Sequence, residues 1–322
     1  MLMWMSKVHK KCPMNNSTNL PPGDWHQEFI NAHLIQAEHI ERTILEKRTS
    51  YQDMVIIEGK HYGKSLILDG KTQSTALDEF IYHEALVHPA MVLHRYPKTI
   101  LLAGGGEGCS AREILKHDTV TNLTMVDIDV GVLEACKEHL SELHGDSFGD
   151  KRVNLVISDI RDYLKETTQM FDVIIIDVPD PLENGPAYKI FTKEFYELLK
   201  THLNQSGTMV TQSGPTSLSY DEDCFYPIVN TVKTIFSNTT AYEVFVPSYG
   251  STWGFTLALH GNSALTKSSL EIDEILSSRN VKDLKMYDGE AHCGLHSLPK
   301  YLRKSLAIET RIITDKNPLF VK

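Results

Sequence analysis

The sequence predicts an α/β protein in which a doubly wound, seven-stranded Rossmann-like sheet follows a small N-terminal antiparallel β domain. Two observations lead to this prediction. Short β-branched runs broken by glycine and aspartate occupy residues 40–75, as in strands joined by turns. From residue 99 on, apolar runs alternate with helix-like stretches, which is the repeated βα unit of a parallel sheet. We therefore expect a disordered tail over residues 1–23, a β-sheet domain over 24–76 and a Rossmann-like domain over 77–322.

The N-terminal part contains the tail, the small sheet and one helix. Residues 1–23 are polar and rich in turn-forming residues, and they lack the apolar density that orders a chain. The runs Met54-Val-Ile-Ile57 and Ser65-Leu-Ile-Leu68 are separated by glycine residues, which predicts antiparallel strands. Residues 77–93 then show helical periodicity, with acidic residues in the opening turn and Pro97 beyond the end.

The rest of the chain alternates between strands and helices. Apolar strands are expected at 99–103, 122–127, 153–157, 172–177, 207–212, 241–247 and 253–259. Helix-like stretches are expected at 109–117, 130–143 and 192–202. The last two strands are separated by the short turn Pro247-Ser-Tyr-Gly250, so we expect them to pair antiparallel at one edge of the sheet. From residue 264 on, the pattern indicates two helices around Tyr287-Asp-Gly289.

The composition limits where the protein works and what it binds. The chain has 322 residues, of which 41% are hydrophobic, and it contains no apolar run long enough to span a membrane, so we expect a soluble cytoplasmic protein. Its net charge of −10 disfavours nucleic acid and favours positively charged ligands. The 5 cysteines are widely spaced without a Cys-x-x-Cys pair, and the 15 histidines form no His-Glu-x-x-His pair. We therefore expect reduced thiols and no metal site.

Glycine and acidic residues follow the strands of the predicted parallel sheet, at the edge where open α/β sheets bind their ligands. Glycines 104–106 would let the backbone approach a ligand at a helix N-terminus, although a tight turn has the same composition. Asp127 ends the next strand about 20 residues later, where a carboxylate accepts hydrogen bonds from ribose hydroxyls. Asp159 ends the third strand, and it would either bind an adenine amino group or cap the helix that begins at Arg161.

A second group of acids follows the buried run 171–177. Asp177 ends this run, and Asp180 comes after Val178-Pro179. Together with Glu107 of the glycine segment, these carboxylates would hold a cation, while capping of a turn is the alternative for Asp180. The Gly-Gly-Gly-Glu-Gly order favours the sheet of S-adenosylmethionine-dependent methyltransferases over a dinucleotide-binding fold. A carboxylate pair at the fourth strand end favours an amine as the second ligand.

With these motifs the sequence resembles the polyamine aminopropyltransferases, the spermidine and spermine synthase family, from Trp25 to the C-terminal helices. The motifs are Ser50-Tyr-Gln-Asp53, Leu68-Asp-Gly70 with Gln73, Asp78-Glu-Phe-Ile-Tyr-His-Glu84, the glycine segment, Val126-Asp-Ile-Asp129, residues 177–181 with Gly185-Pro186, and Gln212. Within this family the chain is most similar to plant thermospermine synthases. That similarity is carried by Glu107, His83, Pro247-Ser-Tyr249, Thr252-Trp-Gly254 and Leu298-Pro-Lys-Tyr-Leu-Arg303.

The resemblance implies an enzyme that uses decarboxylated S-adenosylmethionine as a co-substrate, without a cofactor or a metal. It implies that Asp177 and Tyr82 are catalytic, Asp177 as the proton acceptor and Tyr82 as the group that positions the reacting amine. The implied substrate-binding residues are Gln52, Leu68, Gln73, His83, Glu107, Asp127, Ile128, Asp159, Ile160, Asp180, Gln212, Tyr249 and Trp253, with Gly104, Gly105 and Gly106 as the glycine loop. Val178-Pro179 departs from the small hydroxyl residues that the family usually has between the two acids.

Among these substrate-binding residues, the family's pattern assigns Gln52 and Asp127 to the ribose. It assigns Glu107 to the ammonium of the aminopropyl group.

The expected reaction is an SN2 attack by an amine on the methylene beside the sulfonium. We expect the acceptor to be spermidine and the product thermospermine. The alternative is that putrescine is the acceptor and spermidine the product. A methyltransferase and a non-catalytic nucleoside-binding subunit are the remaining alternatives. The family further implies a homodimer or homotetramer with small-molecule polyamine and nucleoside ligands.

Overall fold

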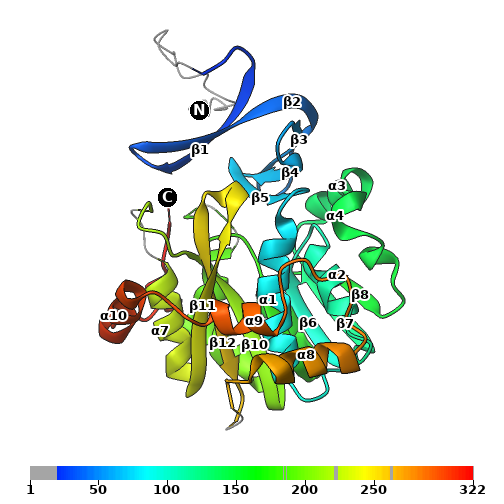
Figure 1. The fold of residues 1–322 in the computed structure, drawn as a ribbon, viewed down its shortest axis with the longest axis vertical. Coiled ribbons are helices and arrows are strands. Elements are labelled where there is room, and N and C mark those ends of the chain that lie inside the picture. The colour runs from blue at the N-terminus through cyan, green and yellow to red at the C-terminus, as the bar shows by residue number, and fades with distance from the viewer. Residues whose placement is uncertain (1–19, 184, 186, 221–223, 262–263, 322) are drawn as a thin grey trace, which may run out of the picture.

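A computed structural model describes residues 20–183, 185, 187–220, 224–261 and 264–321. The chain forms a small sheet that sits above a larger one (Figure 1). Of the tail expected over residues 1–23, residues 1–19 lie outside the described residues. None of the helices in the described part of the chain is long and apolar enough to cross a membrane.

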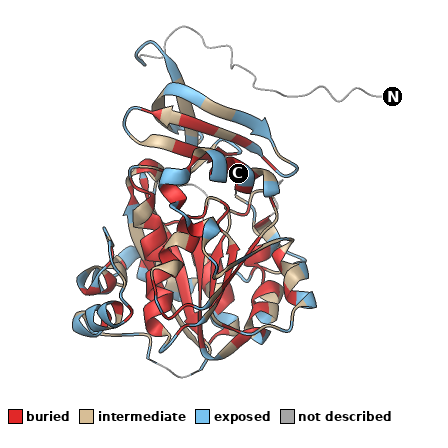
Figure 2. Ribbon diagram, turned by 90° about the vertical axis from the view of Figure 1, so that its right-hand side faces the viewer, coloured by how far each residue is buried: buried red, intermediate tan, exposed pale blue. Residues whose placement is uncertain are grey.

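The small sheet contains five antiparallel strands in sequential order. The strands are β1 (Asp24–Asn31), β2 (Leu34–Arg48), β3 (Asp53–Gly59), β4 (Gly63–Leu68) and β5 (Lys71–Thr75). The sequence predicted β3 and β4, but it gave no signal for β1 or for the first part of β2. Both of these strands lack fully buried residues, so they carry no clear alternation of apolar and polar side chains (Figure 2).

Helix α1 (Glu79–Leu93) joins the two sheets and is buried along almost its whole length. Its start is fixed by the buried Asp78, whose carboxylate accepts hydrogen bonds from the backbone N–H and the hydroxyl of Ser248 at 2.7 and 2.9 Å. This contact holds the turn over residues 247–249 against the beginning of the helix. Tyr82 and His83 of α1 are thereby placed between the two sheets.

The large sheet has seven strands in the order β11-β12-β10-β9-β6-β7-β8. The strands are β6 (Thr99–Gly104), β7 (Asn122–Asp127), β8 (Val153–Ile157), β9 (Phe171–Asp177), β10 (Leu203–Pro215), β11 (Asn238–Val246) and β12 (Ser251–Leu259). The chain leaves β6 in one direction to β7 and β8 and returns to its other side with β9, so the topology switches between β6 and β9. The register aligns Gly104 with Asp177 at this point. β12 pairs antiparallel with β10 and β11, which confirms the predicted edge.

Helices cover both faces of the large sheet, and the buried core lies between them and its strands (Figure 2). After α1 they are α2 (Cys109–Leu115), α3 (Val130–His139), α4 (Ser141–His144), α5 (Ile160–Glu166), α6 (Lys193–Thr201), α7 (Phe225–Ile235), α8 (Ser269–Ser278), α9 (Gly289–Leu295) and α10 (Lys300–Ile308). Short 3-10 turns occupy residues 147–149, 187–191 and 247–249.

Three helix predictions need correction. The stretch expected at 130–143 is divided at Leu140 into α3 and α4. Helix α7 was not predicted, and the C-terminal part contains three helices, not two. Helix α10 buries only Leu302 among its residues, so its apolar face gives a weak periodic signal. After α10 the chain returns to the loop after β9, where Val321 N–H donates to the carbonyl of Pro181 at 3.0 Å.

Candidate functional site

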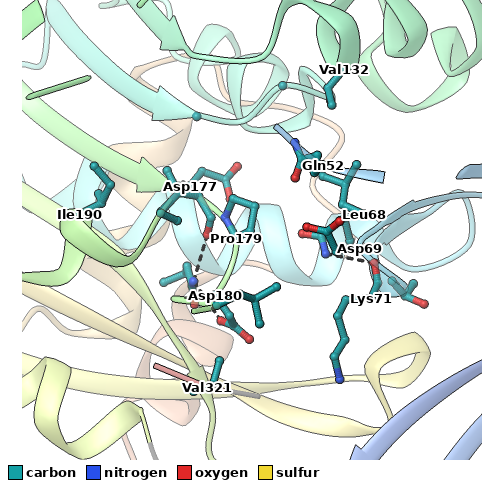
Figure 3. Close-up of a pocket in the computed structure, with 18 of the residues that line it drawn as sticks. Gln52, Leu68, Asp69, Lys71, Val132, Asp177, Pro179, Asp180, Ile190 and Val321 are labelled. Atoms are coloured by element: carbon teal, nitrogen blue, oxygen red, sulfur yellow. Dashed lines mark hydrogen bonds between the residues drawn. The ribbon is translucent and has the colours of Figure 1, made fainter. Parts of the chain in front are cut away.

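A cavity of about 760 Å³ lies where the carboxyl ends of β6, β7, β8 and β9 face the small sheet (Figure 3). Every residue that the sequence placed in the site lines this cavity, with the exception of His83. The parallel strands of one sheet end at one edge, so residues far apart in the sequence meet there. The small sheet closes the opposite side through Gln52, Leu68 and Gln73.

The glycine loop connects the two strands at the switch point. Gly104 and Gly105 have φ values of 81° and 75°, which L side chains rarely adopt. Gly105 N–H donates to the backbone carbonyl of Asp177 at 2.8 Å, and a Cβ atom at Gly104 would collide with the same carbonyl. The loop is therefore a tight turn that also forms the cavity wall, and it fixes the backbone of Asp177.

Asp127 and Gln52 form one end of the cavity. Burial raises the pKa of Asp127 to about 7, and the charges of Asp129, Glu107 and Asp177 act in the same direction. The backbone N–H of Asp129 donates to Asp127 at 2.8 Å, and Gln52 Nε2 donates to the Asp129 carboxylate at 3.0 Å. Asp129 also caps α3, so one helix terminus holds both side chains in place.

Asp159 lies at the same end of the cavity, where it both caps a helix and lines the cavity wall. Its carboxylate accepts from the backbone N–H groups of Arg161 and Asp162 at 2.7 and 3.2 Å, so it caps α5. It also lines the cavity together with Ile160. Capping, the alternative to adenine binding, is thus confirmed, and it leaves Asp159 at the cavity wall.

Asp177 is buried near the middle of the cavity. Tyr82 Oη donates to its Oδ1 at 3.0 Å, and Ser110 Oγ donates to its Oδ2 at 2.6 Å. Burial raises the pKa of Asp177 to about 6 and the charge of Glu107 adds to the rise, while His83, Ser110 and Tyr82 oppose it. A carboxylate with this pKa accepts a proton near neutral pH more readily than an ordinary aspartate. The sequence did not reveal Ser110, because its contact joins two distant elements.

His83 stands behind the cavity wall, so the expected direct contact with substrate is corrected to an indirect one. Its ring is fully buried, with Nε2 3.1 Å from Glu107 Oε1 and Nδ1 2.9 Å from Glu79 Oε2. Burial alone would lower the pKa of His83, but the two carboxylates raise it to about 10. Arg112 also donates to Glu79 at 2.9 Å. His83 is therefore an imidazolium that orients Glu107 at the cavity.

Side chains of the metal-ligating type do converge around His83. The two groups are Glu79, His83 and Cys109, and His83, Glu107 and Asp177. These residues come from separate elements, namely α1, α2, β9 and the glycine loop. Their spacing along the sequence therefore could not reveal the two groups. A histidine ligates a metal as the neutral imidazole. With both nitrogens facing carboxylates and a pKa of about 10, His83 is suited to an ion pair instead.

Asp180 and a line of aromatic rings form the other end of the cavity. Gln212 Nε2 donates to Asp180 Oδ1 at 3.2 Å and to the carbonyl of Val178 at 3.0 Å, and Trp253 Nε1 donates to Gln212 Oε1 at 3.2 Å. Burial raises the pKa of Asp180 to about 6. Its carboxylate is thus held by Gln212, and within the described part of this turn no backbone N–H donates to it.

Three aromatic rings continue along this end. The ring of Tyr249 lies 6.0 Å from that of Tyr82 and 4.9 Å from that of Trp253, and its hydroxyl donates to the carbonyl of Gln73. Apolar ring faces next to carboxylates match a ligand of methylene groups between charged nitrogens.

The cavity is also lined by residues that the sequence did not identify. Among them are Glu28 of β1, Lys71 of β5 and Tyr220 of the loop after β10. Because β1 was not predicted, Glu28 had no assigned position. Lys71 follows the Asp69-Gly70 turn, and nothing in that motif indicates which way the side chain points.

Two family profiles match the sequence. The spermidine synthase tetramerisation domain matches residues 24–76, and the spermine/spermidine synthase domain matches residues 79–268. The polyamine aminopropyltransferase of Sulfolobus acidocaldarius is 40% identical over 295 residues, which cover 92% of this chain and 97% of that protein. The polyamine aminopropyltransferase of Synechococcus sp. (strain JA-2-3B'a(2-13)) is 40% identical over 301 residues, or 91% of this chain and 96% of that protein.

Two solved structures are similar over the same extent. A spermidine synthase in complex with the transition state analogue AdoDATO has a TM-score of 0.82 and 30% identity, covering 91% of this chain and 99% of that chain. The spermidine synthase of Thermotoga maritima has a TM-score of 0.80 and 30% identity, covering 91% and 98%.

Proposed function

The chain belongs to the spermine/spermidine synthase family of polyamine aminopropyltransferases, and from this premise we propose that it converts spermidine to thermospermine. The donor in this proposal is decarboxylated S-adenosylmethionine, and the second product is methylthioadenosine. One observation carries the proposal: a nucleoside-type end around Asp127 and an acidic, aromatic end around Asp177 share one cavity.

The donor would lie with its nucleoside at Asp127 and Gln52 and with its ammonium at Glu107. The carboxylate of Asp127 is placed to accept hydrogen bonds from the ribose hydroxyls. Glu107 is held by His83 at 3.1 Å and lines the cavity beside Asp177. The sulfonium and the methylene next to it would then face the residues of the acidic end.

The transfer step forms a C–N bond and breaks a C–S bond. A neutral amine attacks the methylene beside the sulfonium, and the electron pair of the C–S bond returns to sulfur as methylthioadenosine. Alkyl amines with a pKa near 10.4, as for lysine, are mostly protonated at neutral pH. Asp177 takes the proton that the amine must lose, and Tyr82, which donates to Asp177 at 3.0 Å, orients the pair.

The choice of spermidine, attacked through its three-carbon end, rests on the sequence resemblance to plant thermospermine synthases. Of the residues that carry it, Tyr249 and Trp253 line the acceptor end of the cavity, and His83 contacts Glu107. Asp180 would hold the central nitrogen of spermidine, and the four-carbon arm would extend toward the small sheet.

A specific observation also favours putrescine as the acceptor, with spermidine as the product. The two similar solved structures are described as spermidine synthases, and the curated relatives, from archaea and a cyanobacterium, are described only as polyamine aminopropyltransferases. Putrescine has one ammonium fewer than spermidine. Its far ammonium would therefore reach Asp180, and no part of it would extend to the small sheet.

Product analysis decides between these acceptors and tests the transfer itself. The purified chain is incubated with decarboxylated S-adenosylmethionine and either putrescine or spermidine, and the polyamines are separated and fragmented by mass spectrometry. Thermospermine formed from spermidine at the higher specificity constant supports the proposal. Spermine as the product, or faster use of putrescine, would overturn the choice of acceptor, and methylated products would overturn the transfer.

We also propose that the enzyme assembles as a homodimer or homotetramer in the cytoplasm. The match of residues 24–76 to a tetramerisation domain supports assembly through the small sheet. The exposed apolar side chains Phe29, Leu34 and Ile35 of β1 and β2 offer a surface for it. The thiols of Cys109, Cys136 and Cys293, the first two of them buried, are consistent with a reducing compartment.

A further inference from the structure

Lys71 places a cation inside a cavity whose other charged side chains are acids. Among the described residues that line the cavity, Lys71 is the one basic side chain, whereas eight acidic side chains share the same lining: Glu28, Asp69, Glu107, Asp127, Asp129, Asp159, Asp177 and Asp180. Its side chain runs toward the end of the cavity at which Asp180 and Val321 lie (Figure 3). A cavity for cationic amines would bind them more strongly without this charge.

Lys71 is held in place by two contacts with β1. Its Nζ donates to the carbonyl oxygen of Phe29 at 2.7 Å and lies 3.6 Å from Oε1 of Glu28. The Glu28 side chain is 12% exposed, and its Oε2 accepts from the backbone N–H of Thr72 at 3.0 Å. Lys71 thus neutralises a largely buried carboxylate at the far end of the cavity.

We propose that Lys71 limits the length and charge of the acceptor amine, because its ammonium occupies the place that the terminal ammonium of a longer polyamine would take at Glu28. This inference rests on the proposed function and names the residue that sets acceptor choice. Spermidine, with its central nitrogen at Asp180, would place its terminal ammonium short of Glu28, whereas a polyamine with one more aminopropyl unit would reach it. A longer acceptor brings a ligand ammonium toward a protein ammonium whose carboxylate partner is already paired.

Lys71→Met tests this directly, since it removes the charge and retains most of the side-chain length. With the full chain and decarboxylated S-adenosylmethionine, we compare kcat/KM for putrescine, spermidine and spermine, a series that adds one nitrogen at each step. Relative to putrescine, the value for spermine should rise roughly tenfold or more, as is typical of a close charge pair at an interface. Lys71→Arg keeps the charge and should retain the parental order of the three amines.

Two further variants separate selectivity from general damage. Lys64→Met is the matched control, because Lys64 of the same sheet also contacts a carbonyl oxygen and a carboxylate, those of His139 and Glu142, but does not line the cavity. Lys64→Met should leave the ratio of kcat/KM for spermine to kcat/KM for putrescine unchanged. In the double variant Glu28→Gln with Lys71→Met, the gain for spermine should disappear, because the carboxylate that would receive the ligand ammonium is gone. Lys71→Gln serves as a second variant if thermal unfolding shows that Lys71→Met is destabilised.

The outcomes distinguish this inference from the proposed function. If the parental chain transfers an aminopropyl group to none of the three amines, the proposed function fails. The affinities of the same amines, measured by calorimetry with methylthioadenosine bound, then test Lys71 alone. If the parental chain is active and the spermine to putrescine ratio of Lys71→Met stays within twofold of it, with the same melting temperature, the inference about Lys71 is overturned.

Discussion

At the scale of single residues, the environment of Asp177 separates it from the other acids of the cavity. It ends an apolar strand, its carboxylate has two hydroxyl donors, and its backbone carbonyl is bound by the glycine loop. Burial is the largest cause of its raised pKa. The same carboxylate is therefore fixed in position and suited to accept a proton near neutral pH.

Asp177→Asn should lower turnover by about 10² to 10⁴, the range for loss of a general base, while methylthioadenosine binding stays within twofold. The amide keeps the shape of the side chain but does not take a proton from the amine. Single-turnover rates and calorimetry measure the two effects. Asp180→Asn is the matched control: its carboxylate also has a pKa of about 6, and its loss should raise KM for the amine more than it lowers kcat. Near-parental turnover in Asp177→Asn would exclude Asp177 as the proton acceptor.

Ser110→Ala should move the acidic limb of the pH profile to higher pH. The proton acceptor must be ionised in the free enzyme, so kcat/KM should rise with pH through about 6, the pKa of Asp177. The Ser110 hydroxyl stabilises the ionised form from 2.6 Å, so its removal raises that pKa and the limb follows. Ser65→Ala is the control, since Ser65 is equally buried but lies in β4 away from the cavity. If the acidic limb of the kcat/KM profile of Ser110→Ala stays at the parental pH, a group other than Asp177 controls that limb.

Methylthioadenosine affinity should weaken as the pH falls below about 7, the pKa of Asp127. Ribose hydroxyls donate to the ionised carboxylate, so protonation removes an acceptor, and the affinity should fall by up to about tenfold per pH unit. Calorimetry between pH 6 and pH 8, as test conditions chosen about one unit either side of that pKa, measures the slope. Asp127→Asn should bind methylthioadenosine weakly, and its affinity should not depend on pH in this range. Asp162→Asn, on the exposed face of α5, should show the parental affinity and pH dependence. A parental slope in Asp127→Asn would place the titrating group elsewhere.

At the scale of elements, the sequence predicted all seven strands of the large sheet because each contains an apolar run, and three of these runs end at a glycine or an aspartate. β6, β7 and β9 end at Gly104, Asp127 and Asp177, and these are also the residues of the site. The periodic signal failed where burial is partial, as in β1 and α10. The side-chain partners could not be predicted, because Ser110 and Asp177, or Glu79 and Glu107 around His83, meet only after the elements have packed.

Glu84 of α1 anchors the C-terminal part of the chain to the core. Its buried carboxylate accepts from the backbone N–H groups of Lys285, Met286 and Tyr287 at 2.8 to 2.9 Å. Glu84→Ala leaves these donors without their acceptor and should lower the free energy of unfolding by roughly 3 kcal/mol. Urea unfolding measures the change, and Glu290→Ala in the exposed first turn of α9 should alter it by less than about 0.5 kcal/mol. Equal stability of the two variants would show that the anchor contributes little.

At the scale of the whole molecule, the small sheet has two tasks: it closes the cavity, and it presents apolar side chains to solvent in the single chain. Leu34 and Ile35 of β2 are exposed next to the β1–β2 turn. Exposed apolar side chains that gather on one element are typical of a contact with another protein.

Light scattering should give the purified chain a mass that is a multiple of 36.4 kDa. Changing Leu34 and Ile35 together to Asp should shift the mass toward the monomer, because burying two unpaired charges in an interface is unfavourable. Leu270→Asp on the exposed face of α8 is the control and should keep the parental mass. A parental chain that is monomeric at micromolar concentration would contradict assembly through this sheet.

The division of the cavity between two sheets has a consequence for how such an enzyme diversifies. The large sheet holds Asp127 and Asp177, which we propose bind the donor and accept the proton of the amine, while the small sheet contributes Glu28, Lys71 and Gln73. Substitutions in residues 24–76 therefore reach the wall that meets the acceptor without altering the glycine loop or the strand ends. Grafting this segment from one relative onto another, or randomising it in a directed-evolution library, should redirect the product spectrum while the reacting centre is inherited unchanged.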